Sequence, residues 1–470
     1  MLFSLNHFPH APALRTESDD WSYARLSRAA EEIAHAIGGR TLVFLLCRNR
    51  AESIAGYVAC INYGMVPVMV DGELDGELLH HLAEVYQPSH FWLPQGRKGE
   101  FPLCREAFSL GDYCLLAAEQ ESSYPLHKEL ALLMTTSGST GSPKFVRLSY
   151  ENLRANTASI VEYLGIDEQE RSITSLPMHY VYGLSIINTH LAAGASLVVT
   201  EKTMFQKEFW QLFREKKVTN FGGVPYTFEM LKRLRFPRME LPHLRTITQA
   251  GGKLDPELHR EFAEYAERQG KKFVVMYGAA EATARMGYLP SRQSLRKVGS
   301  MGIAIPGGRF ELVDEERHVI KAADTPGELM YYGANVMMGY AESGADLAKG
   351  DEMGGCLPTG DVAIRDKEGF YTIVGRKKRF LKMFGKRTNL GEVEHLLRQH
   401  FGLTEAACGG ADDHLHVFLT DPEAAEGAVP YLSKKLGLHP SAISVTCLEE
   451  IPKNASGKTL YRELVKYYDL

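Results

Sequence analysis

Helical patterns alternate with short, wholly apolar runs in the first third of this chain. The runs 42–46 and 65–70 contain no charged residue and read as buried strands, while 21–37 and 50–62 read as helices. Ser22 is a suitable N-cap for the first of these helices. Because a strand without a polar face must be covered on both sides, the alternation indicates a mostly parallel sheet with helices on its faces. The same theme returns later, with a helix expected over 149–164, a strand over 195–199 and a helix over 207–216.

From Gly302 onward the pattern changes to short strands and turns, such as 309–313 and 327–332. We therefore predict an α/β fold with a large N-terminal domain of two α/β subdomains plus a β-rich subdomain, followed by a small C-terminal α+β lobe. The basic run after Gly375 suggests a boundary there, which divides the chain into domains 1–375 and 376–470.

Composition excludes several classes of protein. The net charge of −5 over 470 residues argues against a general nucleic-acid binder and gives no indication that the protein binds a membrane surface. The seven cysteines form no Cys-x-x-Cys pair, so neither a disulfide framework nor a zinc site is expected. No signal peptide and no apolar run near the roughly 20 residues of a membrane span is apparent. We expect a cytoplasmic protein.

One short loop has the composition of a polyphosphate-binding site. It runs from Thr135 to Lys144, and its candidate ligands are Thr136, Ser137, Gly138, Ser139, Thr140 and Lys144. Glycines permit close backbone approach, hydroxyl and amide groups donate to phosphate oxygens, and a cation offsets their charge. The spacing is not that of a Walker A loop, and apolar runs on both sides predict that the loop joins strand to strand. A solvated hairpin turn is the ordinary alternative.

Taken with later motifs, this loop resembles the adenylate-forming superfamily, which includes acyl-CoA synthetases, nonribosomal peptide synthetase adenylation domains and firefly luciferase. The matching segments follow the family's order over nearly the whole chain: 136–144, Leu176-Pro177-Met178-His179-Tyr180, Gln249-Ala250-Gly251-Gly252, Tyr277-Gly278-Ala279-Ala280-Glu281, Thr359-Gly360-Asp361, Gly375-Arg376 and Asn454-Ala455-Ser456-Gly457-Lys458. The resemblance implies ATP and Mg²⁺ as cofactors. A carboxylic acid would be joined to AMP with release of pyrophosphate, and the acyl group would then pass to a thiol.

The resemblance also implies roles for single residues. Lys458 would be the main catalytic cation, carried on a mobile C-terminal lobe, and Glu281 would bind magnesium. The nucleotide would be held by the phosphate loop and by Gly251, Gly252, Tyr277, Gly278, Asp361 and Arg376. Lys378 would be the hinge and Gly385 would line the tunnel for the thiol arm. Each of these residues also has an ordinary explanation as a turn, core or surface residue.

Three positions depart from the family's pattern. Ala280 stands where a threonine is usual, and Phe145 replaces the glycine that normally follows the Pro-Lys pair. His179 precedes Tyr180, whereas the family often shows an aromatic residue followed by histidine. Either His179, assigned here as catalytic, or Tyr180 could be the gate beside the acyl carboxylate.

The segment 177–184 contains no acid. Amino-acid-activating relatives use an aspartate there to pair with the α-ammonium group, and a buried ammonium without a partner is costly. We therefore expect a small non-amino carboxylic acid, acyl or aryl, bound by Tyr180, Tyr182, Val224 and Pro225, with Tyr226 and Gly278 as further candidates.

The resemblance implies CoA as the thiol acceptor. Because no basic cluster marks a site for the CoA nucleotide phosphates, the phosphopantetheine of an acyl carrier protein stays open as the alternative acceptor. Two other classes stay open at this stage. One is a nucleotide or acyl sensor that has lost turnover, supported only by Ala280. The other is a phosphotransferase, suggested only by the glycine-rich loop and distinguished by ADP as its product.

Overall fold

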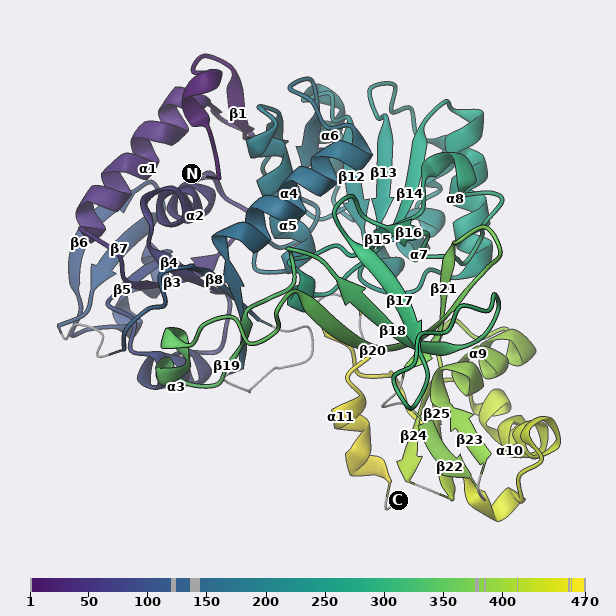
Figure 1. Ribbon diagram of the computed structural model, residues 1–470. Helices are drawn as coiled ribbons and strands as arrows, with labels where there is room; N and C mark the ends of the chain where they lie inside the picture. The colour runs from purple at the N-terminus through teal and green to yellow at the C-terminus, as the bar shows by residue number, and fades with distance from the viewer. Residues whose placement is uncertain are drawn as a thin grey trace. The chain divides into compact units, whose positions relative to one another are not determined.

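The structure is a computed structural model that describes residues 2–119, 124–135, 144–376, 380–383, 386–411, 413–454, 457 and 459–468 (Figure 1). The chain divides into two compact units. The first comprises Met1–Arg309 with Tyr331–Leu357, and the second comprises Phe310–Met330 with Pro358–Leu470. This division places most of the β-rich segment with the C-terminal residues, so the two units are not the domains 1–375 and 376–470. The boundary after residue 375 stays a prediction about where the lobe hinges.

An eight-stranded sheet forms one part of the first unit. Its spatial order is β19 (Gly339–Ala341), β9 (Phe145–Ser149), β8 (Leu130–Thr135), β4 (Val66–Asp71), β3 (Leu42–Cys47), β5 (His90–Pro94), β7 (Tyr113–Ala117) and β6 (Arg105–Leu110). The four central strands, from β8 to β5, are parallel, and the strands on either side join them antiparallel.

Strand β3 shows why this sheet needs cover on both faces, since all six of its residues are buried. Alternate side chains point to opposite faces of a strand. Val43 and Leu45 belong to a core shared with α1 (Tyr23–Ile37) and α2 (Ala51–Tyr63). Phe44 and its neighbours on the other face belong to a core with α3 (Gly76–Tyr86). Figure 1 shows α3 across this sheet from α1 and α2.

The second sheet of this unit has nine strands. Its order is β16 (Ile303–Ala304), β15 (Gly287–Tyr288), β14 (Lys272–Tyr277), β13 (Thr246–Gln249), β12 (Asn220–Gly223), β10 (Arg171–Ile173), β11 (Ser196–Val198), β1 (Pro12–Arg15) and β2 (Asp20–Ser22). The strands from β14 to β1 are parallel. Those at both ends are antiparallel.

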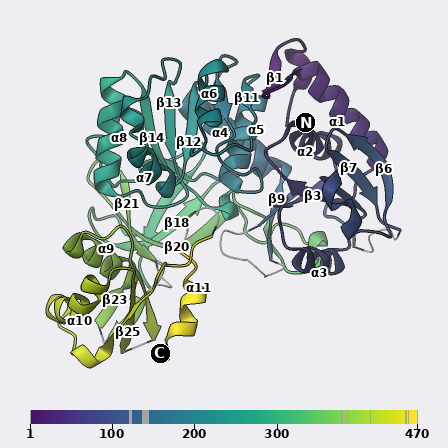
Figure 2. The ribbon, with the colours of Figure 1, turned by 180° about the vertical axis from the view of Figure 1, so that it is seen from behind.

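Helices cover this second sheet. The helices α4 (Tyr150–Leu164) and α5 (Val181–Ala192) contribute to the core that α1 and α2 share. The Tyr57 hydroxyl of α2 donates to Asn188 Oδ1 of α5 at 2.8 Å and ties the two halves together. The helices α6 (Lys207–Glu215), α7 (Pro225–Arg233) and α8 (Pro256–Arg268) lie beside the strands of this sheet (Figure 2). Aromatic rings contribute to the contact, such as Phe228 of α7 against Phe273 of β14.

The second unit contains most of a sheet of β17 (Arg309–Val313), β18 (Gly327–Tyr332), β20 (Cys356–Arg365) and β21 (Tyr371–Arg376). Its C-terminal part is an α+β lobe in which α9 (Leu390–Phe401) and α10 (Pro422–Leu436) share a core with a three-stranded sheet. That sheet is β24 (Ala407–Ala411), β25 (His414–Leu419) and β26 (Ile443–Cys447). The shorter elements are β22 (Phe380–Met383), β23 (Lys386–Asn389) and α11 (Tyr461–Leu464).

The α/β class and its β-rich and α+β parts are confirmed. Each helix and strand named from the sequence is present, with its ends displaced by two residues at most. Ser22 caps α1 by accepting from the Arg25 amide, and Ser149 caps α4 through a reciprocal pair of bonds with Asn152. None of the helices in the described part of the chain is long and apolar enough to cross a membrane.

Candidate active site

The phosphate loop joins two neighbouring antiparallel strands, as predicted. Thr135 at the end of β8 is paired with Phe145 at the start of β9, so the described residues on either side of the loop are cross-strand neighbours. Thr136, Ser137, Gly138, Ser139 and Thr140 lie outside the described residues, and their contact with phosphate stays a prediction.

Lys144, the cation of this loop, faces strand β19. Its ammonium nitrogen lies 3.9 Å from the centre of the Tyr340 ring and 3.5 Å from Glu342 Oε1. Strand β19 reaches this position because it pairs antiparallel with β9, with Tyr340 opposite Val146. A side chain 196 positions away in sequence therefore supports the cation of the phosphate loop, since 144 and 340 are neighbours only through the sheet.

Tyr340 also contacts the predicted magnesium ligand. Its hydroxyl donates to Glu281 Oε1 at 2.9 Å. Glu281 lies in a short 3₁₀ turn over Ala280–Ala282. Burial raises the pKa of Tyr340, and the adjacent Glu281 charge raises it further, so the phenol stays protonated and donates. No ion pair joins Glu281 to a described cation. A partly buried carboxylate with one oriented oxygen suits Mg²⁺, which takes one or two carboxylates together with phosphate oxygens.

A buried arginine fixes β19 beside the phosphate loop. Arg147 of β9 is fully buried; its Nε donates to the Tyr340 carbonyl at 3.0 Å and its Nη1 to the Gly350 carbonyl at 3.2 Å. Nη2 forms an ion pair with Glu352. A guanidinium with this many acceptors holds three stretches of backbone together. Arg147 thus positions Tyr340 and, through it, Glu281.

The segment after Glu281 has an unusual backbone held by asparagine. Thr283 has φ 56° and its hydroxyl donates to the Asn335 carbonyl at 2.7 Å. The Asn335 amide in turn donates to the carbonyls of Ala282 and Arg285, both at 2.8 Å. A Cβ atom at Gly278 would lie 1.7 Å from the Ala284 carbonyl oxygen. The fold of this segment therefore accounts for Gly278, and its role at the nucleotide stays a prediction.

The predicted acid pocket is assembled from three separate segments. Gly251 has φ +87°, and a Cβ atom there would lie 2.5 Å from the Tyr180 hydroxyl and 3.0 Å from Val224 Cγ1. A Cβ atom at Gly252 would lie 3.1 Å from Pro225 Cγ. The structure thus brings Tyr180, Val224, Pro225 and both glycines together, and each glycine leaves space beside an aromatic or apolar wall.

Tyr182 forms the deeper part of this wall. It is buried in α5, and its hydroxyl lies 2.8 Å from Thr248 Oγ1. Burial raises its pKa to about 12, so it is neutral. Tyr226, the further candidate, is 39% exposed at the start of α7.

His179 points elsewhere than Tyr180. Its Nε2 lies 3.8 Å from Asp71 Oδ2 at the end of β4, and its buried Nδ1 has no hydrogen-bond partner among the described residues. Burial lowers the pKa of His179, and the Asp71 charge opposes this only in part, so the imidazole is neutral at pH 7. Of the two candidates for the gate, Tyr180 is the one beside Gly251, and the catalytic role of His179 stays a prediction.

The second unit brings two further predicted residues together. Asp361 and Arg376 are opposite one another on β20 and β21, and Arg376 Nε donates to Asp361 Oδ1 at 2.8 Å. The aspartate is 6% exposed and the arginine 66% exposed. Tyr277 ends β14 in the first unit and is half-buried. Lys458, Lys378 and Gly385 lie outside the described residues.

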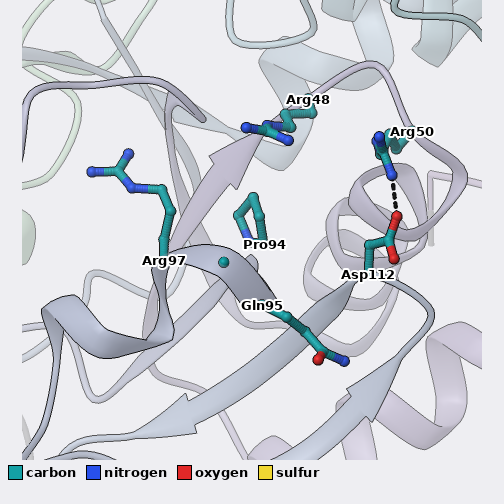
Figure 3. A pocket seen from close by; sticks show the side chains of 7 residues that line it. Arg48, Arg50, Pro94, Gln95, Arg97 and Asp112 are labelled. Carbon is teal, nitrogen blue, oxygen red and sulfur yellow. Dashed lines mark hydrogen bonds and ion pairs between the residues drawn. The ribbon is translucent and has the colours of Figure 1, made fainter.

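A separate cavity of about 370 Å³ in the first unit is lined by three arginines, Arg48, Arg50 and Arg97 (Figure 3). None of the predicted site residues lines it. Each arginine has its own acid, since Arg48 pairs with Glu73, Arg50 with Asp112 and Glu201, and Arg97 with Glu100. The positive charges of these three arginines are therefore balanced by carboxylates of the chain itself.

Residues 3–341 match the family model described as "AMP-binding enzyme". This chain belongs to that family. It is 28% identical to the indoleacetate–CoA ligase of Aromatoleum aromaticum, covering 96% of this chain and 94% of that protein. It is 27% identical to the 2-succinylbenzoate–CoA ligase of Bacillus subtilis, covering 97% and 95% respectively.

Among solved structures, the chain resembles the O-succinylbenzoate coenzyme A synthetase of Bacillus subtilis in complex with ATP and magnesium ion. The TM-score is 0.76 at 24% identity, over 97% of each chain. This likeness shows that the fold of the AMP-binding family is shared over the whole length.

Two residues of this site were missed by the sequence analysis. Tyr340 lies outside every motif, and only the pairing of β19 with β9 brings it to Glu281. Arg285 follows Glu281 by four positions in an otherwise uncharged stretch, Ala282-Thr283-Ala284-Arg285-Met286. That single charge within an apolar run was an available signal.

Proposed function

We propose that this protein is an AMP-forming acid–thiol ligase that activates a non-amino carboxylic acid and transfers the acyl group to CoA. The observation that carries the proposal is the segment 277–285. One of its residues, Glu281, contacts Tyr340 beside Lys144, and the same segment ends at Arg285, whose guanidinium lies on the Tyr182 ring of the acid pocket. A phosphate-binding group and an acid pocket are thus joined by nine residues.

In the first step a carboxylate oxygen of the acid attacks the α-phosphorus of ATP, the bond between the α-phosphorus and the bridging oxygen breaks, and pyrophosphate leaves. Negative charge accumulates around the α-phosphate, so cations and fixed donors supply most of the stabilisation. Lys144 lies at the end of the phosphate loop for this role, and Lys458 is the proposed cation at the α-phosphate. Mg²⁺ held by Glu281 would neutralise the phosphates.

In the second step the thiol sulfur attacks the acyl carbon, the thiol proton is lost, and AMP leaves with the oxygen of the former carboxylate. CoA is the proposed acceptor because the relatives matched over nearly their whole length are CoA ligases. An acyl carrier protein is the alternative acceptor. A non-amino acid is favoured because Tyr180, Tyr182, Val224 and Pro225 offer no carboxylate to an ammonium group.

The test is pyrophosphate release from Mg-ATP over a panel of fatty, aryl, hydroxy and amino acids, with CoA, with a carrier protein that bears a free phosphopantetheine thiol, or with neither. We expect release with one class of non-amino acid and AMP as the nucleotide product. Thioester formation with CoA would support the full proposal. If the thioester forms only on the carrier protein, the carrier protein and not CoA is the acceptor. ADP as product, or ATP binding without any release, would reject the ligase.

Lys458→Ala provides the residue-level prediction for this mechanism. Loss of a cation at the developing charge should lower the rate of adenylate formation by about 1,000-fold. ATP binding, measured by isothermal titration, should be largely retained. A variant that forms acyl-AMP at the wild-type rate would show that Lys458 is not the catalytic cation.

A further inference from the structure

Arg285 is a buried cation without a carboxylate partner in the described chain. Arg285 is 3% exposed. Nη1 donates to the carbonyl of the preceding Ala284 at 3.0 Å, and the guanidinium carbon lies 4.0 Å from the centre of the Tyr182 ring. The Nε atom is buried and has no hydrogen-bond partner among the described residues.

Arg147 shows how this chain buries an arginine for structural purposes. It pairs with Glu352 and donates to backbone carbonyls from Nε, Nη1 and Nη2. Buried charges in proteins are normally paired in this way, because an unpaired one loses its hydration without compensation. Arg285 instead keeps one edge of the guanidinium, at Nε, without an acceptor.

The position of Arg285 associates it with the acid pocket. It stacks on Tyr182, and its charge opposes the rise in pKa that burial causes at Tyr180 and Tyr182. The Tyr180 hydroxyl is the group that a side chain at Gly251 would strike. Arg285 therefore lies in the same neighbourhood as Tyr180, Tyr182 and Gly251.

The direction of the segment also matters. Glu281, the proposed metal ligand, lies at one side of the turn, and Arg285 follows it on the side of the tyrosines. An acid bound with its reacting carboxylate at the phosphates would extend its other end into the tyrosine-lined region. A guanidinium there would bind a second anionic group at the far end of the acyl chain or ring.

We propose that Arg285 is a specificity-determining residue and that the acid activated by this enzyme carries a second carboxylate, which the Nε edge of Arg285 binds. The inference rests on the proposed function and names its substrate class. A planar guanidinium and a carboxylate match in geometry and charge, and the apolar surroundings strengthen the pair. Monocarboxylic acids of the same size would leave the Nε group of the buried cation without an acceptor and be rejected.

The experiment compares dicarboxylic acids with their distal mono-methyl esters, which keep the carbon skeleton and remove the second charge. Straight-chain and aryl pairs are assayed for kcat/KM of pyrophosphate release. We expect the wild type to favour the best diacid over its half-ester by about 100-fold or more. Arg285→Gln should bring this ratio near one, by lowering kcat/KM for the diacid and not for the half-ester.

Two further variants serve as controls. Arg285→Lys keeps the charge without the planar donor edge and should retain part of the preference. Arg154→Gln removes an exposed arginine that pairs only with Glu151 and should leave the ratio unchanged. If Arg285→Gln does not fold, the Lys variant and the wild-type ratio decide the question.

Several outcomes would overturn the inference. The inference is wrong if the wild type has a higher kcat/KM for half-esters or simple monoacids than for diacids. Equal losses for diacid and half-ester in Arg285→Gln would show that Arg285 acts on the reacting carboxylate or on the fold alone. If none of the acids supports pyrophosphate release by the wild type, the proposed function fails by itself. Isothermal titration of the diacids then decides the inference, which survives only if they bind and Arg285→Gln weakens that binding.

Discussion

Tyr340 illustrates how one hydroxyl can orient a carboxylate, here that of Glu281, the proposed metal ligand. Burial and the Glu281 charge both raise the pKa of this phenol, so its proton stays in place and is donated to Oε1. Because that bond restrains one oxygen, the other is presented in a defined direction. The same ring lies 3.9 Å from the Lys144 ammonium group, so one side chain contacts both the cation of the phosphate loop and the proposed metal ligand.

We predict that Tyr340→Phe weakens the use of magnesium while preserving the fold. The ring and its contact with Lys144 remain, but Glu281 loses its oriented hydrogen bond, worth about 1.5–3 kcal/mol for a charged acceptor. The concentration of Mg²⁺ that half-saturates pyrophosphate release should rise about 10-fold or more. Thermal unfolding measured without nucleotide should change little by comparison.

Tyr86→Phe is the matched control, because it removes a buried hydroxyl that donates to the neighbouring Ala341 carbonyl at 2.9 Å and does not contact Glu281. An unchanged Mg²⁺ dependence is expected there. The same shift in both variants would mean that strand β19, and not the hydroxyl on Glu281, determines metal binding.

At the scale of the element, β9 and β19 form the support for the phosphate loop. Strand β9 begins one residue after Lys144, and β19 contributes Tyr340. Only three residue pairs join the two strands, from Gly339–Arg147 to Ala341–Phe145. So short a ladder is weak by itself, and the buried guanidinium of Arg147 supplies the additional bonds that hold β19 in register.

We predict that Arg147→Met destabilises the protein by about 3 kcal/mol or more, because it leaves Glu352 unpaired and buried carbonyls without donors. Hydrogen exchange should accelerate most over residues 338–341. Arg154→Gln, which breaks an exposed pair, should change stability by less than about 1 kcal/mol. Normal protection of 338–341 in Arg147→Met would contradict the role given to this side chain.

At the scale of the whole molecule, the residues assigned to the chemistry are divided between two compact units. Glu281, Lys144 and the acid pocket belong to the first, while Asp361, Arg376 and Lys458 belong to the second. Adenylation and thioester formation require different groups at the acyl carbon and at the phosphates. We propose that the C-terminal lobe turns about Lys378 between these steps.

Lys378→Pro should slow thioester formation and leave the first burst of pyrophosphate release in place. Proline restricts φ to about −65° and so removes the backbone freedom that a hinge requires. Lys378→Ala keeps that freedom and should support both steps. Wild-type thioester turnover in the proline variant would place the hinge elsewhere.

Much of the architecture was predictable from the chain alone. Apolar runs such as 42–46 identify themselves as buried strands because nothing polar interrupts them, and Ser22 and Ser149 cap their helices through bonds with residues three positions away. The motifs marked Gly251, Asp361 and Arg376 as nucleotide-binding residues and Tyr180 as an acid-binding residue. The structure brings Gly251 beside Tyr180 and pairs Asp361 with Arg376.

Other features depend on contacts between residues far apart in sequence. No local pattern connects Tyr340 with Glu281 or Arg147 with Glu352, because strand order is decided by how whole faces pack. Similarly, the sequence contains 53 lysines and arginines and does not indicate which are buried without an acid. The sequence by itself determined the fold class and the family, and it supplied the candidate segments for binding the phosphates and the acid. Only the tertiary structure decided that Arg285 is buried on Tyr182 with a free donor edge, because burial and pairing are properties of the packed chain.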